Sequence, residues 1–136
     1  MLGSRPNLIG ADFLLLTKGT GQAILSTEEQ LQNIASKLTP TGSQPVSGTL
    51  MHSEFEQAVK DLNNPLLKTE VSYKNGIVVP RGTAGSVRLD VVEYNPNGTV
   101  KAIFDLKTGK AGLTQTRINQ ILSHVGENVP VVGIRP

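Results

Sequence analysis

Three ionisable side chains lie in or beside two apolar segments, where buried hydrophobic residues would be expected. Asp90 interrupts the segment Val87–Tyr94, and Asp105 and Lys107 stand at the end of Thr99–Leu106. Both segments are rich in Val, Ile and aromatic residues, which predicts two β-strands. Side chains alternate between the faces of a strand, so Asp105 and Lys107 project from the same face.

The turn between these strands decides which residue faces Asp90. A four-residue turn over Asn95–Gly98 sets Asp90 opposite Ile103, whereas a two-residue turn over Asn97-Gly98 sets it opposite Asp105. Both turns have an even length, and only an odd shift would move a side chain to the other face. In either case Asp90, Asp105 and Lys107 share one face of the sheet.

Two carboxylates held close together repel each other unless a cation lies between them. Hard divalent cations such as Mg²⁺ take oxygen ligands, often one or two carboxylates together with substrate phosphate. A metal ion there polarises a phosphodiester and acidifies a bound water, while Lys107 orients that water or stabilises developing negative charge. The alternative is an internal salt-bridge cluster of Asp90, Asp105 and Lys107, although burying three charges without function is energetically poor.

The surrounding elements follow from periodicity and turn residues. Ser26 and Glu29 have the spacing of a capping box, which predicts a helix beginning at Ser26. A linker is expected over Pro40–Gly48, and helical spacing of apolar residues predicts a second helix over Thr49–Leu62.

Strands are expected next at 67–73 and 77–80, joined by a tight turn at Asn75-Gly76. After the predicted hairpin, Thr114 can cap a helix, and the chain closes with a strand around 129–134. The last two strands should form a right-handed parallel crossover unit. The sequence thus predicts an α+β fold whose mixed sheet is flanked by helices. Residues 1–45 are expected as an N-terminal helical segment and linker, and 46–136 as the core, treated as one domain.

Asp90, followed fifteen residues later by Asp105-Leu106-Lys107, resembles the PD-(D/E)XK signature of restriction-endonuclease-like nucleases. The predicted α-β-β-β-α-β order is similar to the common core of that superfamily. Residues 82–117, including Arg117, also resemble nuclease domains at the C-termini of bacterial polymorphic toxins, such as contact-dependent growth inhibition and Rhs-type effectors. One departure is Leu89, which stands where the motif's name has Pro.

The resemblance implies a metal-dependent endonuclease that acts as an interbacterial toxin on DNA or tRNA. It implies that Asp90, Asp105 and the backbone carbonyl of Leu106 hold Mg²⁺, or another divalent cation such as Mn²⁺ or Zn²⁺. It also implies a cognate immunity protein as partner, secretion as part of a larger effector, and action in the target-cell cytoplasm. A non-catalytic nucleic-acid or protein-binding module on the same scaffold is the alternative.

Members of this superfamily often contribute a glutamate from the helix that precedes the sheet. Glu56 is the expected residue, with Glu54 and Glu70 as further candidates. Glu56 could instead cap a helix with Ser53, because Ser53-x-x-Glu56 has capping-box spacing, and Glu54 fits a solvated face. His52, on the same helix, is interpreted as a surface or capping residue rather than a general base.

The charge is distributed unevenly along the chain. Residues 1–65 carry four basic and six acidic side chains, whereas residues 66–136 carry nine basic and five acidic ones. A basic half suits a polyanionic partner, because neutralising phosphates releases counterions. Phosphate contacts are therefore expected from Arg81, Arg88, Lys110 and Arg117, each of which could instead be a solvated base. The few aromatic residues offer little surface for stacking unpaired bases, which favours a duplex or structured substrate.

Composition excludes several classes of protein. The chain has no cysteine, so it holds no disulfide, thiolate metal site or cysteine nucleophile. It has only two histidines, His52 and His124, which argues against a histidine-rich metal site. Its longest apolar run, Phe13–Leu16, is far shorter than the ~20 residues that cross a bilayer, so no membrane-spanning segment is expected.

Overall fold

The computed structural model describes residues 25–38, 46–108 and 112–136, with the side chains of 46–48 left out. These residues belong to two compact units, divided between Asn33 and Ile34. The expected linker over Pro40–Gly48 lies outside the described residues up to position 45. Lys110 lies outside them too.

The first helix, α1 (Thr27–Ser36), begins as the capping box predicts. The backbone N–H of Ser26 donates to Oε1 of Glu29 over 2.9 Å, and the N–H of Glu29 donates to Oγ of Ser26 over 3.1 Å. Each residue satisfies an N–H group that the helix itself leaves without a partner.

The second helix, α2 (Val46–Asp61), begins three residues earlier than expected, so the prediction of a linker through Gly48 is wrong. Met51, Phe55 and Val59 are buried on one stripe, as the helical spacing predicts. Asn63, with a φ of 55°, follows the end of the helix in the left-handed region. Asparagine tolerates that conformation better than most residues.

Five strands form one mixed sheet in the order β2-β1-β3-β4-β5. Their bounds are β1 (Leu67–Lys74), β2 (Ile77–Val79), β3 (Val87–Tyr94), β4 (Val100–Leu106) and β5 (Val131–Ile134). Every neighbouring pair is antiparallel except β4 and β5, which are parallel. The chain passes between those two strands through α3 (Gln115–Val125), as expected.

The α+β fold with a mixed sheet flanked by helices is thereby confirmed. The short edge strand β2 makes four strands between the helices, one more than the α-β-β-β-α-β order counts. Asn75 and Gly76 both have positive φ, 53° and 85°, as a two-residue turn between twisted strands requires. No helix in the described part of the chain is both long and apolar enough to cross a bilayer.

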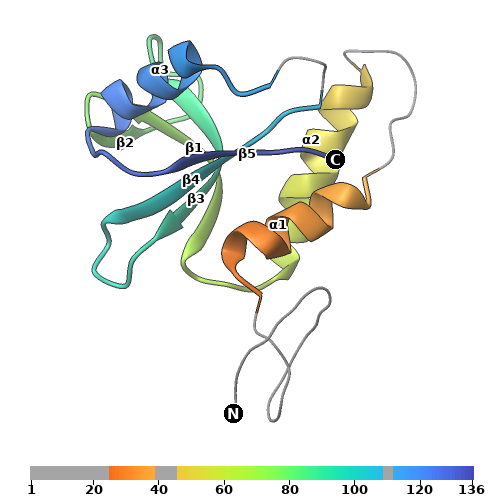
Figure 1. Cartoon of the computed structure of the whole chain (residues 1–136). Coiled ribbons are helices and arrows are strands. Elements are labelled where there is room, and N and C mark those ends of the chain that lie inside the picture. Colours follow the sequence, from red (N-terminus) through yellow and green to blue (C-terminus); the bar gives the residue numbers. More distant parts are fainter. Residues whose placement is uncertain (1–24, 39–45, 109–111) are drawn as a thin grey trace. The chain divides into compact units, whose positions relative to one another are not determined.

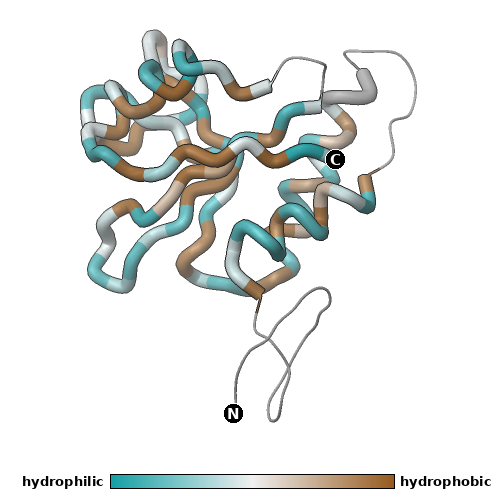
Figure 2. The backbone as a smooth tube through the Cα atoms, in the orientation of Figure 1, coloured by the Kyte–Doolittle hydropathy of each residue, from teal (hydrophilic) through white to brown (hydrophobic). Residues whose placement is uncertain are grey.

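Within residues 34–136, α2 and α3 cover different faces of the sheet (Figure 1). Ile121 and Val125 of α3 pack in one cluster with strand residues such as Leu89 and Ile103, and the buried residues of α2 lie outside that cluster. Hydrophobic residues concentrate in the middle of the sheet, while the turn after β3 is hydrophilic (Figure 2). The sheet is thus buried on both faces, and its strand ends are left to form a site.

Candidate functional site

The pairing of β3 with β4 brings the two aspartates together. Val91 faces Phe104 and Val92 faces Ile103, and a bulge between Glu93 and Tyr94 adjusts the register near the turn. Continued by one residue, this register sets Asp90 opposite Asp105. The shorter-turn alternative thus names the correct partner, but neither expected turn forms. Tyr94 pairs with Val100, which leaves an odd number of residues between them, and the bulge shifts the register back by one residue.

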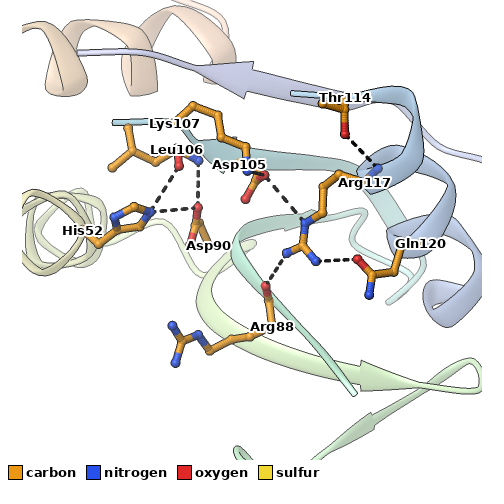
Figure 3. Close-up of polar contacts among 9 residues, drawn as sticks. All are labelled: His52, Arg88, Asp90, Asp105, Leu106, Lys107, Thr114, Arg117 and Gln120. Atoms are coloured by element: carbon orange, nitrogen blue, oxygen red, sulfur yellow. Dashed lines mark hydrogen bonds and ion pairs between the residues drawn. The ribbon is translucent and has the colours of Figure 1, made fainter. Parts of the chain in front are cut away.

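Backbone pairing between β3 and β4 stops before Leu106, and side chains take over there (Figure 3). The N–H of Leu106 donates to Oδ2 of Asp90 over 2.7 Å. The carbonyl oxygen of Leu106 lies 3.1 Å from Nε2 of His52, and the same nitrogen lies 3.6 Å from Oδ2 of Asp90. A carboxylate, an imidazole and a backbone carbonyl thus converge where the ladder ends.

Asp90 is stabilised as the charged form. Burial raises its pKa, but hydrogen bonding by His52, Asp105 and the N–H of Leu106 outweighs burial and holds the pKa below its ordinary value. A carboxylate that accepts several hydrogen bonds keeps its negative charge to lower pH. Asp90 therefore presents a permanent negative charge at neutral pH.

Asp105 behaves in the opposite way. Burial, reinforced by the neighbouring Asp90, raises its pKa above the ordinary value despite the lowering effect of Lys107. Its Oδ2 atom lies 2.9 Å from Nζ of Lys107 and 4.0 Å from Nε of Arg117. That oxygen is nonetheless buried and accepts no hydrogen bond from the described residues, so these contacts are ion pairs without directed hydrogen bonds.

The expected trio therefore lies together, as predicted from strand alternation. Asp90 and Asp105 are neighbours across the ladder, and Lys107, directly after the end of β4, reaches back to Asp105.

Arg117 connects three elements around this site. Its backbone N–H donates to Oγ1 of Thr114, which caps the start of α3 and fixes the backbone from which the side chain projects. The guanidinium donates to the carbonyl oxygen of Arg88 over 3.2 Å and to Oε1 of Gln120 over 3.1 Å. Since several of its donors are already used within the protein, Arg117 holds β3 against α3 as well as facing the site (Figure 3).

A cleft of about 810 Å³ opens over the trio, and its walls carry both acidic and basic groups. Of the expected phosphate contacts, Arg81, Arg88 and Arg117 line it. The backbone of Arg81 belongs to the loop before β3, and Arg88 forms an ion pair with Glu70 at 3.2 Å. Positive charge in a concave surface raises the local concentration of anions.

Of the three glutamates considered as metal ligands, Glu56 and Glu70 line the cleft and Glu54 does not. Glu56 lines the cleft, where it accepts a 3.4 Å hydrogen bond from Thr69 and forms a 2.9 Å ion pair with Lys60. The interpretation of Glu56 as a capping partner of Ser53 is wrong, because both residues lie inside α2 rather than at its start. Glu54 is exposed and does not line the cleft, as expected for a solvated face.

Glu70 also lines the cleft, on the strand next to Asp90. Thr69 pairs with Val91 and Val71 with Leu89, which leaves Glu70 and Asp90 facing each other in the ladder. Burial raises the pKa of Glu70, Arg88 lowers it, and Asp90 raises it further, so the net shift is upward. Its φ of 54° is unusual for a strand residue, and such strain is often found at functional sites.

His52 is the site residue that sequence reasoning misses. The sequence favours a surface or capping role, yet the ring reaches the end of β4, 54 positions away in the sequence. One sequence signal does point to the site: His52 and Glu56 are four residues apart, so they share a face of α2. Both line the same cleft.

The residues fit a divalent cation only if the backbone takes part. Among the described residues, no three His, Cys, Asp or Glu side chains form a ligand cluster by themselves. The carbonyl of Leu106 lies beside His52, whose Nε2 atom also reaches Asp90, and Asp105 is the neighbour of Asp90 across the ladder. Oδ2 of Asp105 is a buried acceptor that receives no hydrogen bond from the described residues. Oxygen donors of this kind suit hard divalent cations.

No protein-family model matches this chain, no curated protein is significantly similar to it, and no solved structure matches it.

Proposed function

We propose that the chain is a metal-dependent endonuclease that hydrolyses phosphodiester bonds. The observation that carries the proposal is the meeting of Asp90 and Asp105 across one ladder, with Nζ of Lys107 only 2.9 Å from Asp105, at the floor of a cleft lined by arginines. The PD-(D/E)XK resemblance of the same residues supports it. Two carboxylates with oppositely shifted pKa values beside a lysine are typical of a functional site.

Asp90, Asp105 and the carbonyl of Leu106 would bind the cation. Glu56 or Glu70, on the cleft wall, would supply a further ligand. When bound there, Mg²⁺ or a similar ion would polarise the phosphate and lower the pKa of a bound water. Lys107 places positive charge where charge develops on the phosphate and orients the attacking water. Arg81 and Arg88 would hold neighbouring phosphates of the substrate.

The same resemblance leads us to propose that the nuclease is an interbacterial toxin. In this proposal a larger effector delivers the domain to the target-cell cytoplasm, and a cognate immunity protein in the producing cell blocks the cleft. Expression of the wild-type chain alone in a bacterial host should stop growth. Co-expression of a protein that covers the cleft should restore growth.

The decisive experiment incubates metal-free protein with plasmid DNA and with total tRNA, in Mg²⁺, Mn²⁺, Zn²⁺ or EDTA. We expect cleavage of one substrate class with a divalent cation and none in EDTA. Asp105→Asn should lower the rate by ~10²-fold or more, the usual size for loss of a positioned electrostatic group. Asp61→Asn, at the exposed end of α2, is the matched control and should cleave like the wild type.

Cleavage of neither substrate with any cation would contradict the proposal, and full activity of Asp105→Asn would place catalysis elsewhere. Binding of nucleic acid without cleavage would favour the alternative, a non-catalytic binding module.

A further inference from the structure

His52 has no role in the site as the sequence predicts it, yet its ring enters that site. Its side chain is 37% exposed and lines the cleft, whereas the Asp90 side chain beside it is only 12% exposed. Met51 and Phe55, on either side of His52 in α2, are almost fully buried. The helix therefore has little freedom to withdraw the imidazole from the end of β4.

Three atoms that could bind a metal ion lie together at this point: Nε2 of His52, Oδ2 of Asp90 and the carbonyl oxygen of Leu106. The nitrogen lies 3.1 Å from the carbonyl oxygen and 3.6 Å from the carboxylate oxygen. Two ligands held ~2.1 Å from one ion are ~3.0 Å apart at a right angle and ~3.4 Å apart at a tetrahedral angle. The observed separations match the edges of such a coordination polyhedron.

These atoms are held in place by different parts of the protein. The N–H of Leu106 fixes the Asp90 carboxylate from β4, and the N–H of Lys107, the next residue, donates to the carbonyl of Ile134 in β5 over 2.8 Å. Because β4 is bonded on both sides, the carbonyl of Leu106 keeps its direction. A site whose ligands are fixed before binding loses less free energy in ordering them.

We propose that His52 is a nitrogen ligand of the cation, so that this site binds a transition-metal ion such as Zn²⁺ in preference to Mg²⁺. Imidazole suits zinc and its neighbours in the first transition row, whereas magnesium prefers oxygen ligands and keeps most of its water. The inference deepens the proposed function, since it rests on a cation at the same site and assigns that cation its class. The alternative is that His52 only donates a hydrogen bond to the carbonyl of Leu106.

Metal affinity tests the inference without any assay of cleavage. Untagged, metal-free protein is titrated calorimetrically with Zn²⁺ and with Mg²⁺, for wild type, His52→Gln and His124→Gln. Changing a partner outside the ligand set commonly lowers metal affinity 10- to 100-fold, so loss of a direct ligand should lower zinc affinity by at least ~10-fold. Magnesium affinity should change much less, and His124→Gln, outside the cleft, should bind both ions like the wild type.

The imidazole nitrogens give a second readout. Since the chain has two histidines, ¹⁵N spectra of the rings contain signals from only two residues. Zinc should shift the Nε2 resonance of His52 and leave that of His124 in place. Equal zinc affinity of wild type and His52→Gln, or an unmoved His52 resonance at saturating zinc, would overturn the inference.

Failure of this inference is distinguishable from failure of the proposed function. Zinc bound through His52 without cleavage of any nucleic acid would support the ligand assignment and contradict the nuclease. Cleavage with Mg²⁺, together with zinc affinity that does not depend on His52, would support the nuclease and overturn the ligand assignment.

Discussion

The backbone N–H of Leu106 donates to the carboxylate of Asp90 over 2.7 Å, at the point where the ladder between β3 and β4 ends. The Asp90 side chain, from β3, thereby takes the place of a backbone carbonyl as the acceptor for this N–H of β4. The bond fixes the carboxylate that the proposed function requires, and it also satisfies a polar group of the strand end.

Asp90→Ala should therefore destabilise the metal-free protein, because it leaves this N–H without its acceptor. A buried donor without a partner costs about 1–3 kcal/mol. Asp90→Asn retains an acceptor oxygen and should lose less of the free energy of unfolding. Urea unfolding in EDTA measures both variants. Equal stability of the alanine variant and wild type would show that the bond contributes nothing.

Asp105 leads to the opposite prediction. Because its pKa is raised in the folded protein, the folded state binds the proton more tightly than the unfolded chain does. Its contribution to stability is therefore greatest at low pH, and it declines as the pH rises from the ordinary carboxyl value, about 4, through the raised pKa. Asp105→Asn should remove this decline and should be at least as stable as wild type at neutral pH in EDTA.

Asp90 should affect the pH dependence of the free energy of unfolding in the opposite sense to Asp105. Its lowered pKa stabilises the folded protein at neutral pH, and that contribution is lost as the pH falls through the depressed value. Unfolding free energies of the two asparagine variants, measured from acidic to neutral pH, should therefore change in opposite directions relative to wild type. A marked loss of stability of Asp105→Asn at neutral pH would instead indicate that its ion pair with Lys107 is a structural salt bridge.

Much of this site follows from the sequence, because strand alternation is a local rule. The spacing of Asp105 and Lys107 places both on one face whatever their surroundings are, and the turn residues bring Asp90 near them. The choice between Ile103 and Asp105 as the residue facing Asp90 needs the structure. A bulge at Glu93/Tyr94 decides the register, and no turn residue predicts it.

His52 and the start of α2 show what local rules leave out. His52 and Leu106 are 54 positions apart in the sequence, so their contact depends on how α2 packs against the sheet. The spacing of residues within the helix does not determine that packing. Helix α2 begins at Val46, although Gly48 is a poor helix former, since packing of a helix can outweigh the propensity of single residues. The interpretation of Glu56 as a cap depends on that boundary.

The substitution Arg81→Ala tests whether the cleft binds the phosphates of a nucleic acid. The Arg81 side chain is exposed at the cleft wall, so Arg81→Ala should weaken nucleic-acid binding for all sequences alike. The slope of log affinity against log salt should fall by ~1, because one phosphate fewer is neutralised. Lys68→Ala, an exposed base outside the cleft, is the matched control and should leave the slope nearly unchanged. Equal slopes for the two variants would mean that the cleft does not bind the nucleic-acid backbone.

The most direct test of the nuclease compares binding with cleavage in Lys107→Arg. Arginine keeps the positive charge but replaces a compact ammonium with a planar fork, so it should not orient the same water. We predict wild-type affinity for the substrate and cleavage ~10²-fold slower or more, measured in single turnover. Lys101→Arg, at an exposed position of β4 outside the cleft, should match wild type in both measurements. Cleavage by Lys107→Arg at the wild-type rate would contradict catalysis by Asp90, Asp105 and Lys107.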